Sequence, residues 1–499
     1  MKFQRIPLFL LGVLIAIYAL VYLNEEILGT SYLPGVESLP GFRPNPVSVE
    51  PDSAVSSIIS QANAVENLNA LFVGDKADTT IATAPVPFVG VDSTQQTDTV
   101  LTAPPLPTVD VVQALEFDER GKAQLSRFFA ALKNSQKQQV RIFHFGDSQI
   151  EGDRISSFLR SRLQNTFGGG GVGLVPLVPN HYLPYGLRMK AKGWKRFNFM
   201  PARKRIKGLD YGLCGSLARC VDTFEENDTV YYFADVVVRR SRNAGRAMNF
   251  NRCRILYHPT VSPTTMDIDL ADTIYDSYTS EGSAIYQEHS FTVPHKDKAF
   301  TLSFSSEGPI EVYGLSLETQ YGVQVDNVAL RGSSGTDFTS FSDSLLTAYA
   351  QHFAPRLILL QFGVNVVPSR LKDYSYYQRQ LKRQILRLKR LFPTAAFILI
   401  GVSDMAQKVG ETMQSYSNIP IVKEAQRKAA FEAGIAFWDM QAAMGGTNAM
   451  LAWVAAKKSL ATKDYVHFTP RGARLIAEMF YAALLDEYTK YSRGGARAE

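Results

Sequence analysis

The sequence predicts an α/β fold built on a parallel sheet and interrupted by an all-β domain. In the first and last parts of the chain, apolar strand-like runs alternate with amphipathic helix-like segments, a pattern typical of parallel sheets covered by helices. Between residues 192 and 318 the pattern changes to short alternating segments bounded by turn residues, which favours a β-sandwich or jelly roll. The 499 residues, 45% of them hydrophobic, suffice for two or three domains.

The N-terminus has the pattern of a transmembrane helix. Residues 6–23 carry no charge, and this length is close to what a bilayer requires. Lys2 and Arg5 precede the run and Glu25 and Glu26 follow it, which predicts that the bulk of the chain lies outside the cytoplasm. A cleaved signal peptide is the alternative. Because no small-residue cleavage pattern follows promptly, we favour a retained membrane anchor over residues 1–29. Residues 30–111, rich in Pro, Ser, Thr, Val and Ala, indicate an extracytoplasmic linker.

The segment 112–191 holds the first candidate for chemistry. An amphipathic helix over Asp118–Lys133 precedes an apolar run, 140–145, which stops at Gly146, Asp147 and Ser148 before a helix-like pattern begins. This pattern predicts a buried strand that delivers a serine to the first turn of a helix, where free N–H groups and the helix dipole would stabilise an oxyanion. The alternative is that Asp147 or Ser148 is only an N-cap.

A second candidate lies near the C-terminus. Pro470 and Arg471 indicate the first turn of a long helix through Leu485, so that Asp464 and His467 lie on the loop before it. Such a loop suits a histidine that reaches a nucleophile and a carboxylate that orients its ring. A lone loop histidine beside an Asx-type turn is the alternative.

The segment 319–490 alternates strands with helices, and residues 491–499 form a tail. Asn365 follows the strand 357–362 and can donate an amide N–H to a developing negative charge, although a turn asparagine is the alternative. Gly335 lies in a flexible loop after the extended run 323–330. Ser403 and Asp404 follow a third strand and could line the cleft or cap a helix. Since the carboxyl ends of parallel strands share one edge, these residues and Ser148 are expected on the same side of the sheet. The remaining expected elements are helices at 338–352, 376–391 and 422–433 and strands at 397–402 and 435–439.

The order of these motifs resembles the four sequence blocks of the SGNH (GDSL-like) hydrolase superfamily, with GDS at 146–148, GxxG at 332–335, GxN at 363–365 and DxxHxT at 464–469. The resemblance implies a three-layer SGNH fold with Ser148 as nucleophile, His467 as general base and Asp464 as its orienting group. It also implies an oxyanion hole made of the N–H groups of Ser148 and Gly335 and the amide of Asn365. Gln149 departs from the leucine or histidine that is more usual there, which leaves the local pocket wall undefined. Asp147 and Gln149 are further candidates to line the cleft.

The β insertion after the first block is similar to that of periplasmic peptidoglycan O-acetylesterases and related O-acetyltransferases, in which the inserted module resembles a carbohydrate-binding domain. The resemblance implies a serine esterase that removes O-acetyl groups from a cell-envelope polysaccharide, with peptidoglycan favoured, through an acyl-serine and without metal or cofactor. It further implies a single-pass protein of the inner (cytoplasmic) membrane with its catalytic domain in the periplasm. The alternatives are an O-acetyltransferase served by an integral-membrane acyl donor protein, a membrane-tethered glycan-binding protein, and a lipase or thioesterase.

Charge and cysteine content narrow the function further. The net charge of +6 arises from 53 basic and 47 acidic residues, and no basic stripe with interleaved aromatics appears, which argues against nucleic-acid binding. Arginines and lysines recur at helical spacing over 379–390, where we favour a solvated face over a polyanion-binding one. The spacing permits a Cys214–Cys220 disulfide with Cys253 unpaired, and it lacks the second pair that a zinc site needs.

Overall fold

The computed structural model describes residues 55, 59, 111–179, 183–241, 245–258, 262–271, 273–283, 285–294 and 298–495. The predicted anchor (1–29) and almost all of the predicted linker (30–111) lie outside the described residues. Within the described ranges, no helix combines the length and the apolar character needed to cross a bilayer.

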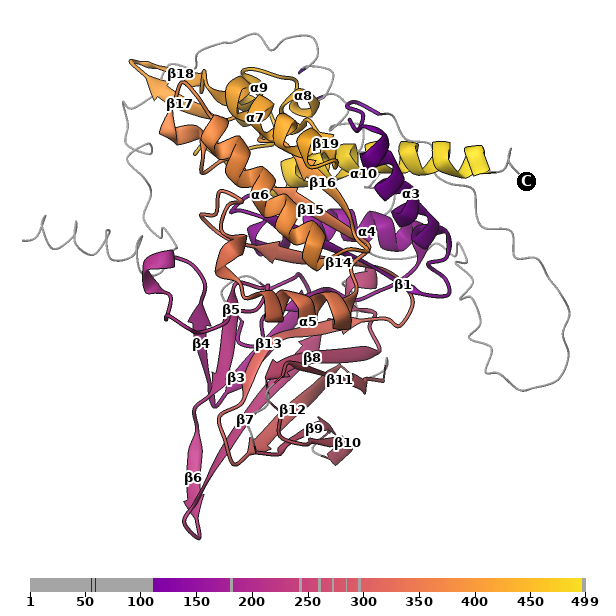
Figure 1. Cartoon of the computed structure of the whole chain (residues 1–499), viewed down its shortest axis with the longest axis vertical. Coiled ribbons are helices and arrows are strands. Elements are labelled where there is room, and N and C mark those ends of the chain that lie inside the picture. The colour runs from indigo at the N-terminus through magenta and orange to yellow at the C-terminus, as the bar shows by residue number, and fades with distance from the viewer. Residues whose placement is uncertain are drawn as a thin grey trace, which may run out of the picture. The chain divides into compact units, whose positions relative to one another are not determined.

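The α/β part is organised around a five-stranded sheet in which every pairing is parallel, as predicted. The strand order is β14-β1-β15-β16-β19 (Figure 1). The strands are β1 (Gln139–Gly146), β14 (Gly322–Ala329), β15 (Leu357–Gln361), β16 (Ala396–Ile400) and β19 (Ala436–Trp438). The chain enters the sheet at β1 and returns to it at β14, beside β1, only after the all-β module.

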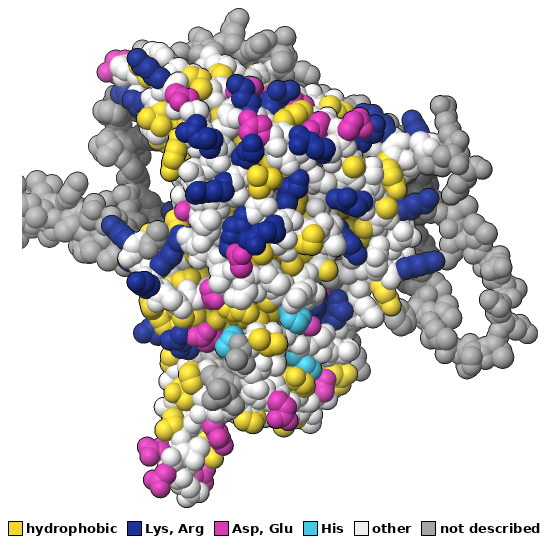
Figure 2. Space-filling view, in the orientation of Figure 1, with side chains coloured by type: hydrophobic (Ala, Val, Ile, Leu, Met, Phe, Trp, Pro, Cys, Tyr) yellow, Lys and Arg dark blue, Asp and Glu magenta, His cyan; other side chains and the backbone are white. Residues whose placement is uncertain are grey.

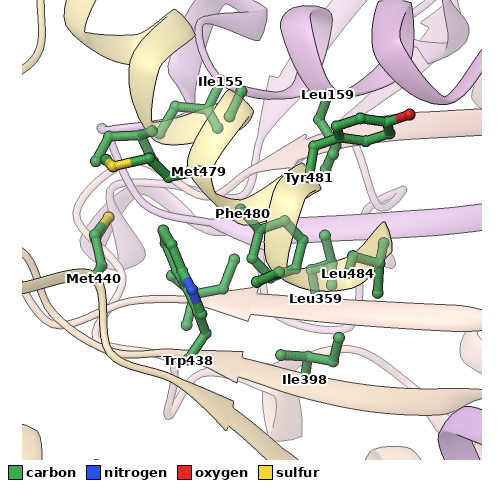
Figure 3. Close-up of a cluster of buried hydrophobic side chains, with 14 of the residues drawn as sticks. Ile155, Leu159, Leu359, Ile398, Trp438, Met440, Met479, Phe480, Tyr481 and Leu484 are labelled. Carbon is green, nitrogen blue, oxygen red and sulfur yellow. The ribbon is translucent and has the colours of Figure 1, made fainter. Parts of the chain in front are cut away.

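Helices cover both faces of this sheet because alternate strand residues point to opposite sides. Val140 and Ile142 of β1 pack with α3 (Glu119–Lys133), α4 (Ser156–Phe167), α8 (Met440–Met444), α9 (Ala449–Ala455) and α10 (Pro470–Gly495). Phe143 and Phe145 pack with α5 (Asp343–Phe353), α6 (Ser375–Leu391) and α7 (Ile419–Glu432) on the other face. Figure 3 shows part of the first core, where the Trp438 ring meets Phe480 of α10 edge-on at 5.3 Å between centroids.

Two predicted helix starts are wrong, each for a local reason. The helix expected from Phe338 begins at Asp343, because the Ser342 side chain caps it by accepting from the Leu345 N–H, and Phe338–Ser340 forms a separate 3-10 turn, η6. The helix expected directly after Ser148 begins only at Ser156. Gly152 and Asp153, in η3 (Glu151–Asp153), have φ of +71° and +63° and interrupt it. Ser148 therefore lies in a turn ahead of α4, and the predicted helix-dipole contribution at Ser148 does not apply.

The all-β module consists of two antiparallel sheets that enclose their own apolar core. One sheet contains β3 (Leu187–Lys192), β6 (Thr223–Glu226), β7 (Thr229–Arg240), β9 (Thr264–Leu270), β10 (Thr273–Ser280) and β12 (Ala299–Ser306). The other contains β2 (Gly173–Val175), β4 (Trp194–Asn198), β5 (Ser216–Cys220), β8 (Arg252–His258), β11 (Gln287–Thr292) and β13 (Glu311–Glu318). Its first strand, β2, precedes the predicted boundary at residue 192. Cys214, Cys220 and Cys253 are free, so the disulfide that their spacing permits is not formed.

Short elements complete the described chain: the 3-10 turns η4 (Ala202–Lys204), η5 (Gly245–Met248) and η7 (Val367–Ser369), and the hairpin of β17 (Ala406–Val409) and β18 (Thr412–Ser415). Figure 2 shows basic side chains spread over the face that α6 crosses and acidic ones at the tip of the β6–β7 hairpin. On α6, Arg387 and Arg390 pair with Asp343, and Lys382 pairs with Glu432. These pairs are consistent with the solvated face that the spacing favoured.

A buried ionic cluster joins the module to the parallel sheet. Arg141 of β1 pairs with Glu318 of β13 and, at 2.7 Å, with Asp326 of β14. Asp326 also accepts a 2.7 Å hydrogen bond from the Leu174 N–H of β2. From the module, Arg254 donates to the His352 carbonyl in the last turn of α5, where a cation complements the helix dipole. The module is thus fixed to the sheet by directional polar contacts.

Candidate active site

Three side chains from opposite ends of the sequence meet at the carboxyl edge of the sheet. Ser148 follows β1, and His467 and Asp464 lie on the loop before α10. The Ser148 Oγ lies 2.8 Å from the His467 Nε2, and the His467 Nδ1 lies 2.6 Å from the Asp464 Oδ2. With Asp464 accepting from Nδ1–H, the Nε2 lone pair faces the serine hydroxyl. This is the arrangement in which a histidine can take the proton of an attacking serine.

The loop around Asp464 is built to keep its carboxylate ionised and fixed. The Oδ1 atom accepts from the Thr462 hydroxyl at 2.6 Å and from the backbone N–H groups of Val466 and His467 at 3.0 Å each. Tyr465 completes the tight turn with φ of +58°. Partial burial raises the pKa of Asp464, but the hydrogen bonds from His467, Thr462 and Val466 outweigh it and hold this pKa well below its ordinary value. Asp464 is therefore an acceptor for the His467 ring at any physiological pH.

The predicted oxyanion donors lie together but are partly engaged with their own loop. The Asn365 Nδ2 donates to the Ser333 carbonyl at 2.9 Å, which leaves its second amide hydrogen for another acceptor. The Gly335 N–H donates to the Ser333 Oγ at 3.0 Å, and this hydroxyl donates to Asp337 at 2.8 Å. Gly335 has φ of +81°, and a Cβ there would lie 2.8 Å from the Phe362 ring, so only glycine fits. Ser333 thus connects the second and third sequence blocks.

Asp147 is buried beneath the serine rather than exposed in a cleft. Its Oδ1 accepts from the Gln149 N–H at 3.0 Å, and its Oδ2 has no hydrogen bond to a described residue. Burial raises the pKa of Asp147 to about 7, against the lowering effect of the Gln149 N–H, the nearby His467 and the backbone N–H groups of Gly363 and Val364. A carboxyl of this kind titrates in the range in which esterases are assayed.

Gln149, the departure from the family pattern, holds the histidine loop. Its Nε2 donates to the Val466 carbonyl at 2.9 Å and to the Ser403 hydroxyl at 2.8 Å, and its side chain is 1% exposed. Val466 directly precedes His467, so this amide fixes the backbone that carries the ring.

Asp404 does not face the serine. It is fully buried and accepts from the Ser415 hydroxyl at 2.8 Å and from the Met450 N–H, in the first turn of α9, at 2.9 Å. Burial raises the pKa of Asp404, and these hydrogen bonds lower it. Asp404 therefore connects the segment after β16 to the first turn of α9. This role resembles the helix cap that was the alternative to a place in the cleft.

Sequence reasoning missed a polar chain that continues inward from Gln149. The Gln361 Nε2 donates to the Gln149 Oε1 at 3.4 Å, and the Gln361 Oε1 lies 3.1 Å from the His144 Nε2. The His144 Nδ1 lies 2.9 Å from the Ser156 hydroxyl, which in turn accepts from the Asn327 Nδ2 at 2.8 Å. Burial lowers the pKa of His144 to about 4, so the ring is neutral and can donate at one nitrogen and accept at the other. The signal was visible as a histidine inside β1 and a glutamine at the end of the otherwise apolar β15.

Within the described ranges, no three His, Cys, Asp or Glu side chains gather as a metal-binding cluster. Residues 276–475 match the model of the GDSL-like Lipase/Acylhydrolase family. This part of the chain is similar to GDSL-like acylhydrolases. The match includes Gly335, Asn365, Asp464 and His467, whereas Ser148 lies ahead of it, on the far side of the inserted module. This match supports the predicted serine hydrolase of the esterase type. No curated protein matches the sequence.

One solved structure shares the fold of this chain, and others are similar over parts of it. A peptidoglycan O-acetylesterase aligns with a TM-score of 0.61 at 21% identity, over 75% of this chain and 99% of its own. An acetyl xylan esterase aligns with a TM-score of 0.26 at 17% identity, over 32% of this chain and 81% of its own. A family two carbohydrate esterase from Clostridium thermocellum, bound to a cello-oligosaccharide, aligns with a TM-score of 0.25 at 9% identity, over 53% of this chain and 95% of its own.

Proposed function

We propose that this acylhydrolase removes O-acetyl groups from a cell-envelope polysaccharide, with peptidoglycan as the favoured substrate. The observation that carries the proposal is the hydrogen-bonded series Ser148–His467–Asp464 at the sheet edge of a GDSL-like domain. The choice of glycan is supported by the fold shared with a peptidoglycan O-acetylesterase over nearly all of that enzyme's length.

The geometry supports a two-step mechanism. The Ser148 Oγ attacks the acetyl carbonyl carbon while His467 Nε2 takes the hydroxyl proton, and the Asp464 carboxylate stabilises the resulting imidazolium. The negative charge on the carbonyl oxygen is stabilised by the free amide hydrogen of Asn365 and the backbone N–H of Ser148, and the Gly335 N–H joins them if it leaves the Ser333 hydroxyl. The tetrahedral intermediate collapses as His467 returns its proton to the sugar oxygen. Water, deprotonated by His467, then cleaves the acetyl-serine and releases acetate.

We extend the proposal to location and partners. The apolar run at 6–23 and the charges beside it support a single-pass anchor in the inner membrane with the esterase on its outer, periplasmic side. In that position the substrate is the acetylated wall glycan. An integral-membrane acyl donor would be needed only if the second step used a sugar hydroxyl instead of water.

The test is acetate release from O-acetylated peptidoglycan by the full-length chain, with Ser148→Ala as the inactive control. Release by the wild type alone would support the proposal. Hydrolysis of 4-nitrophenyl acetate without release from the polymer would reject the glycan substrate but not the esterase. A sharp preference for long acyl chains would favour a lipase. Transfer of acetyl to an added glycan, exceeding the yield of free acetate, would favour the O-acetyltransferase.

A further inference from the structure

A cavity lies between the β module and the nucleophile side of the parallel sheet. Its volume is about 510 Å³, within the range of small-ligand sites. The module contributes Arg196 and Asn198 of β4 together with the loop residues 200–201 and 214–215, and the catalytic part contributes Glu151 and residues 329–332. A smaller cavity shares Glu151, Cys214 and Ala329 with it, so the hollow continues along the junction.

The catalytic-side wall of this cavity is formed by residues close in sequence to those of the candidate active site. Glu151 lies three positions after Ser148, and Gly332 lies three positions before Gly335. Gly332 is followed by Ser333, whose carbonyl accepts from Asn365. These sequence neighbours connect the cavity wall to the Ser148 turn and to the loop that holds Asn365.

Arg196 is the charged side chain of the cavity that has no carboxylate partner among the described residues. Its side chain is partly buried and donates to the Asn198 Oδ1 at 2.7 Å and to the Val178 carbonyl, and it forms no ion pair with any carboxylate of the described residues. Burial lowers the pKa of Arg196 because the charged guanidinium loses water. Partly buried charges are normally paired, so an unpaired arginine beside a cavity is suited to a ligand anion.

The surrounding charges agree with an anionic ligand. Arg331 is 71% exposed, and its nearest carboxylate, Glu151, is 3.9 Å away, beyond hydrogen-bond distance. Of the described residues that line the cavity, only Glu151 is acidic. Burial raises the pKa of the Cys214 thiol, which is therefore neutral there.

We infer that this cavity is a glycan subsite in which Arg196 binds a carboxylate carried by the acetylated polysaccharide, with Arg331 at its rim. The inference rests on the proposed function and specifies its substrate as an acidic acetylated glycan. In peptidoglycan the carboxylate is one on the attached peptide or, where a sugar carries no peptide, that of its lactyl ether.

The test compares full-length wild type, Arg196→Gln and the matched control Arg188→Gln, which alters an exposed arginine of β3 that does not line the cavity. Loss of a charge-assisted hydrogen bond should lower kcat/KM for acetate release from O-acetylated peptidoglycan by about 10- to 100-fold in Arg196→Gln. Most of this effect is expected in KM. Activity on 4-nitrophenyl acetate should be unchanged in all three proteins, and Arg188→Gln should match the wild type on the polymer.

A second experiment changes the carboxylates of the substrate instead of the protein. Converting the glycan carboxylates to methylamides should lower wild-type kcat/KM to the level of Arg196→Gln and leave that variant unaffected. Stripping the peptide frees the lactyl carboxylate, so sensitivity to Arg196→Gln on stripped strands shows that the subsite accepts the sugar carboxylate, and lost sensitivity assigns the peptide. Equal activity of Arg196→Gln and wild type on unmodified glycan would overturn the inference while leaving the esterase intact. Failure of the wild type itself on the glycan would overturn the proposed function and this inference with it.

Discussion

Two clusters of ionisable side chains lie along β1 or at its carboxyl end, and they differ in solvent exposure. Arg141, Glu318 and Asp326 are at most 1% exposed. Burial raises the pKa of Glu318, yet Arg141, Arg254 and Arg252 overcome this and hold that pKa at about 2. At the carboxyl end of the same strand, His467 is 28% and Asp464 49% exposed. Both clusters use charge-assisted hydrogen bonds, but only the second presents atoms that a substrate can touch. Exposure, more than residue type, separates the reactive cluster from the structural one.

A substitution in the exposed cluster should lower activity without lowering the stability of the fold. In Asp464→Asn the His467 ring loses the carboxylate that fixes its tautomer, and kcat on 4-nitrophenyl acetate should fall by about 10⁴-fold. The urea midpoint should stay close to that of the wild type, because Asp464 is half exposed. A fall of less than tenfold would show that Asp464 does not orient His467.

A substitution in the buried cluster should lower stability without lowering the activity of the folded protein. Arg141→Met leaves Glu318 and Asp326 without their shared cation, which should lower the free energy of unfolding by about 3–5 kcal/mol in urea titrations. At 15 °C, where folded protein remains, kcat per folded molecule should match the wild type. A loss of kcat in the folded fraction would contradict the separation of the two clusters.

Asn365 belongs to the reactive side of the comparison although it carries no charge. Asn365→Ala should lower kcat by about 10²- to 10³-fold with little change in KM, since the amide stabilises charge that exists only in the transition state. Ser333→Ala is the matched control for loop damage, because it removes the Oγ bound to the Gly335 N–H and leaves the Ser333 carbonyl that holds Asn365. An equal loss in both variants would indicate loop distortion instead of oxyanion binding.

His144, midway along β1, should make the free energy of unfolding depend on pH. Burial lowers its pKa from 6.5 to about 4, so the folded state resists a proton that the unfolded state accepts below pH 6.5. Its contribution is present above pH 6.5 and is lost as the pH falls toward 4, by about 3 kcal/mol in total. The difference in unfolding free energy between wild type and His144→Gln should narrow by this amount over that range. A difference independent of pH would contradict the neutral buried ring.

Gln149 links the two halves of the comparison and should give the smallest effect. Gln149→Leu removes the donor to the Val466 carbonyl and leaves that acceptor unpaired, so kcat should fall by about tenfold, with KM unchanged. Gln149→Glu is the second variant. It keeps the shape of the side chain and loses the same donor, so it separates the loss of the hydrogen bond from a change of shape. Equal, unchanged kcat in both variants would show that the amide does not position His467.

The sequence by itself determined the alternating α/β pattern, the antiparallel insertion and the motif-bearing ends of the strands. These follow from local periodicity and from residues such as Gly335, whose backbone conformation few others adopt. Because the carboxyl ends of parallel strands share one edge, Ser148, Gly335 and Asn365 were also predicted to lie near one another, and the resemblance in motif order added Asp464 and His467.

Only the tertiary structure decided which polar residues face solvent and which are buried. Asp147 and Asp404 follow strands just as Ser148 and Asn365 do, yet both are buried. The chain of Gln149, Gln361 and His144 depends on contacts between residues more than 200 positions apart. Likewise, Arg196 meets the nucleophile side only because the module folds back onto the parallel sheet. Periodicity specifies each element, whereas a site between elements depends on long-range packing that no local pattern encodes.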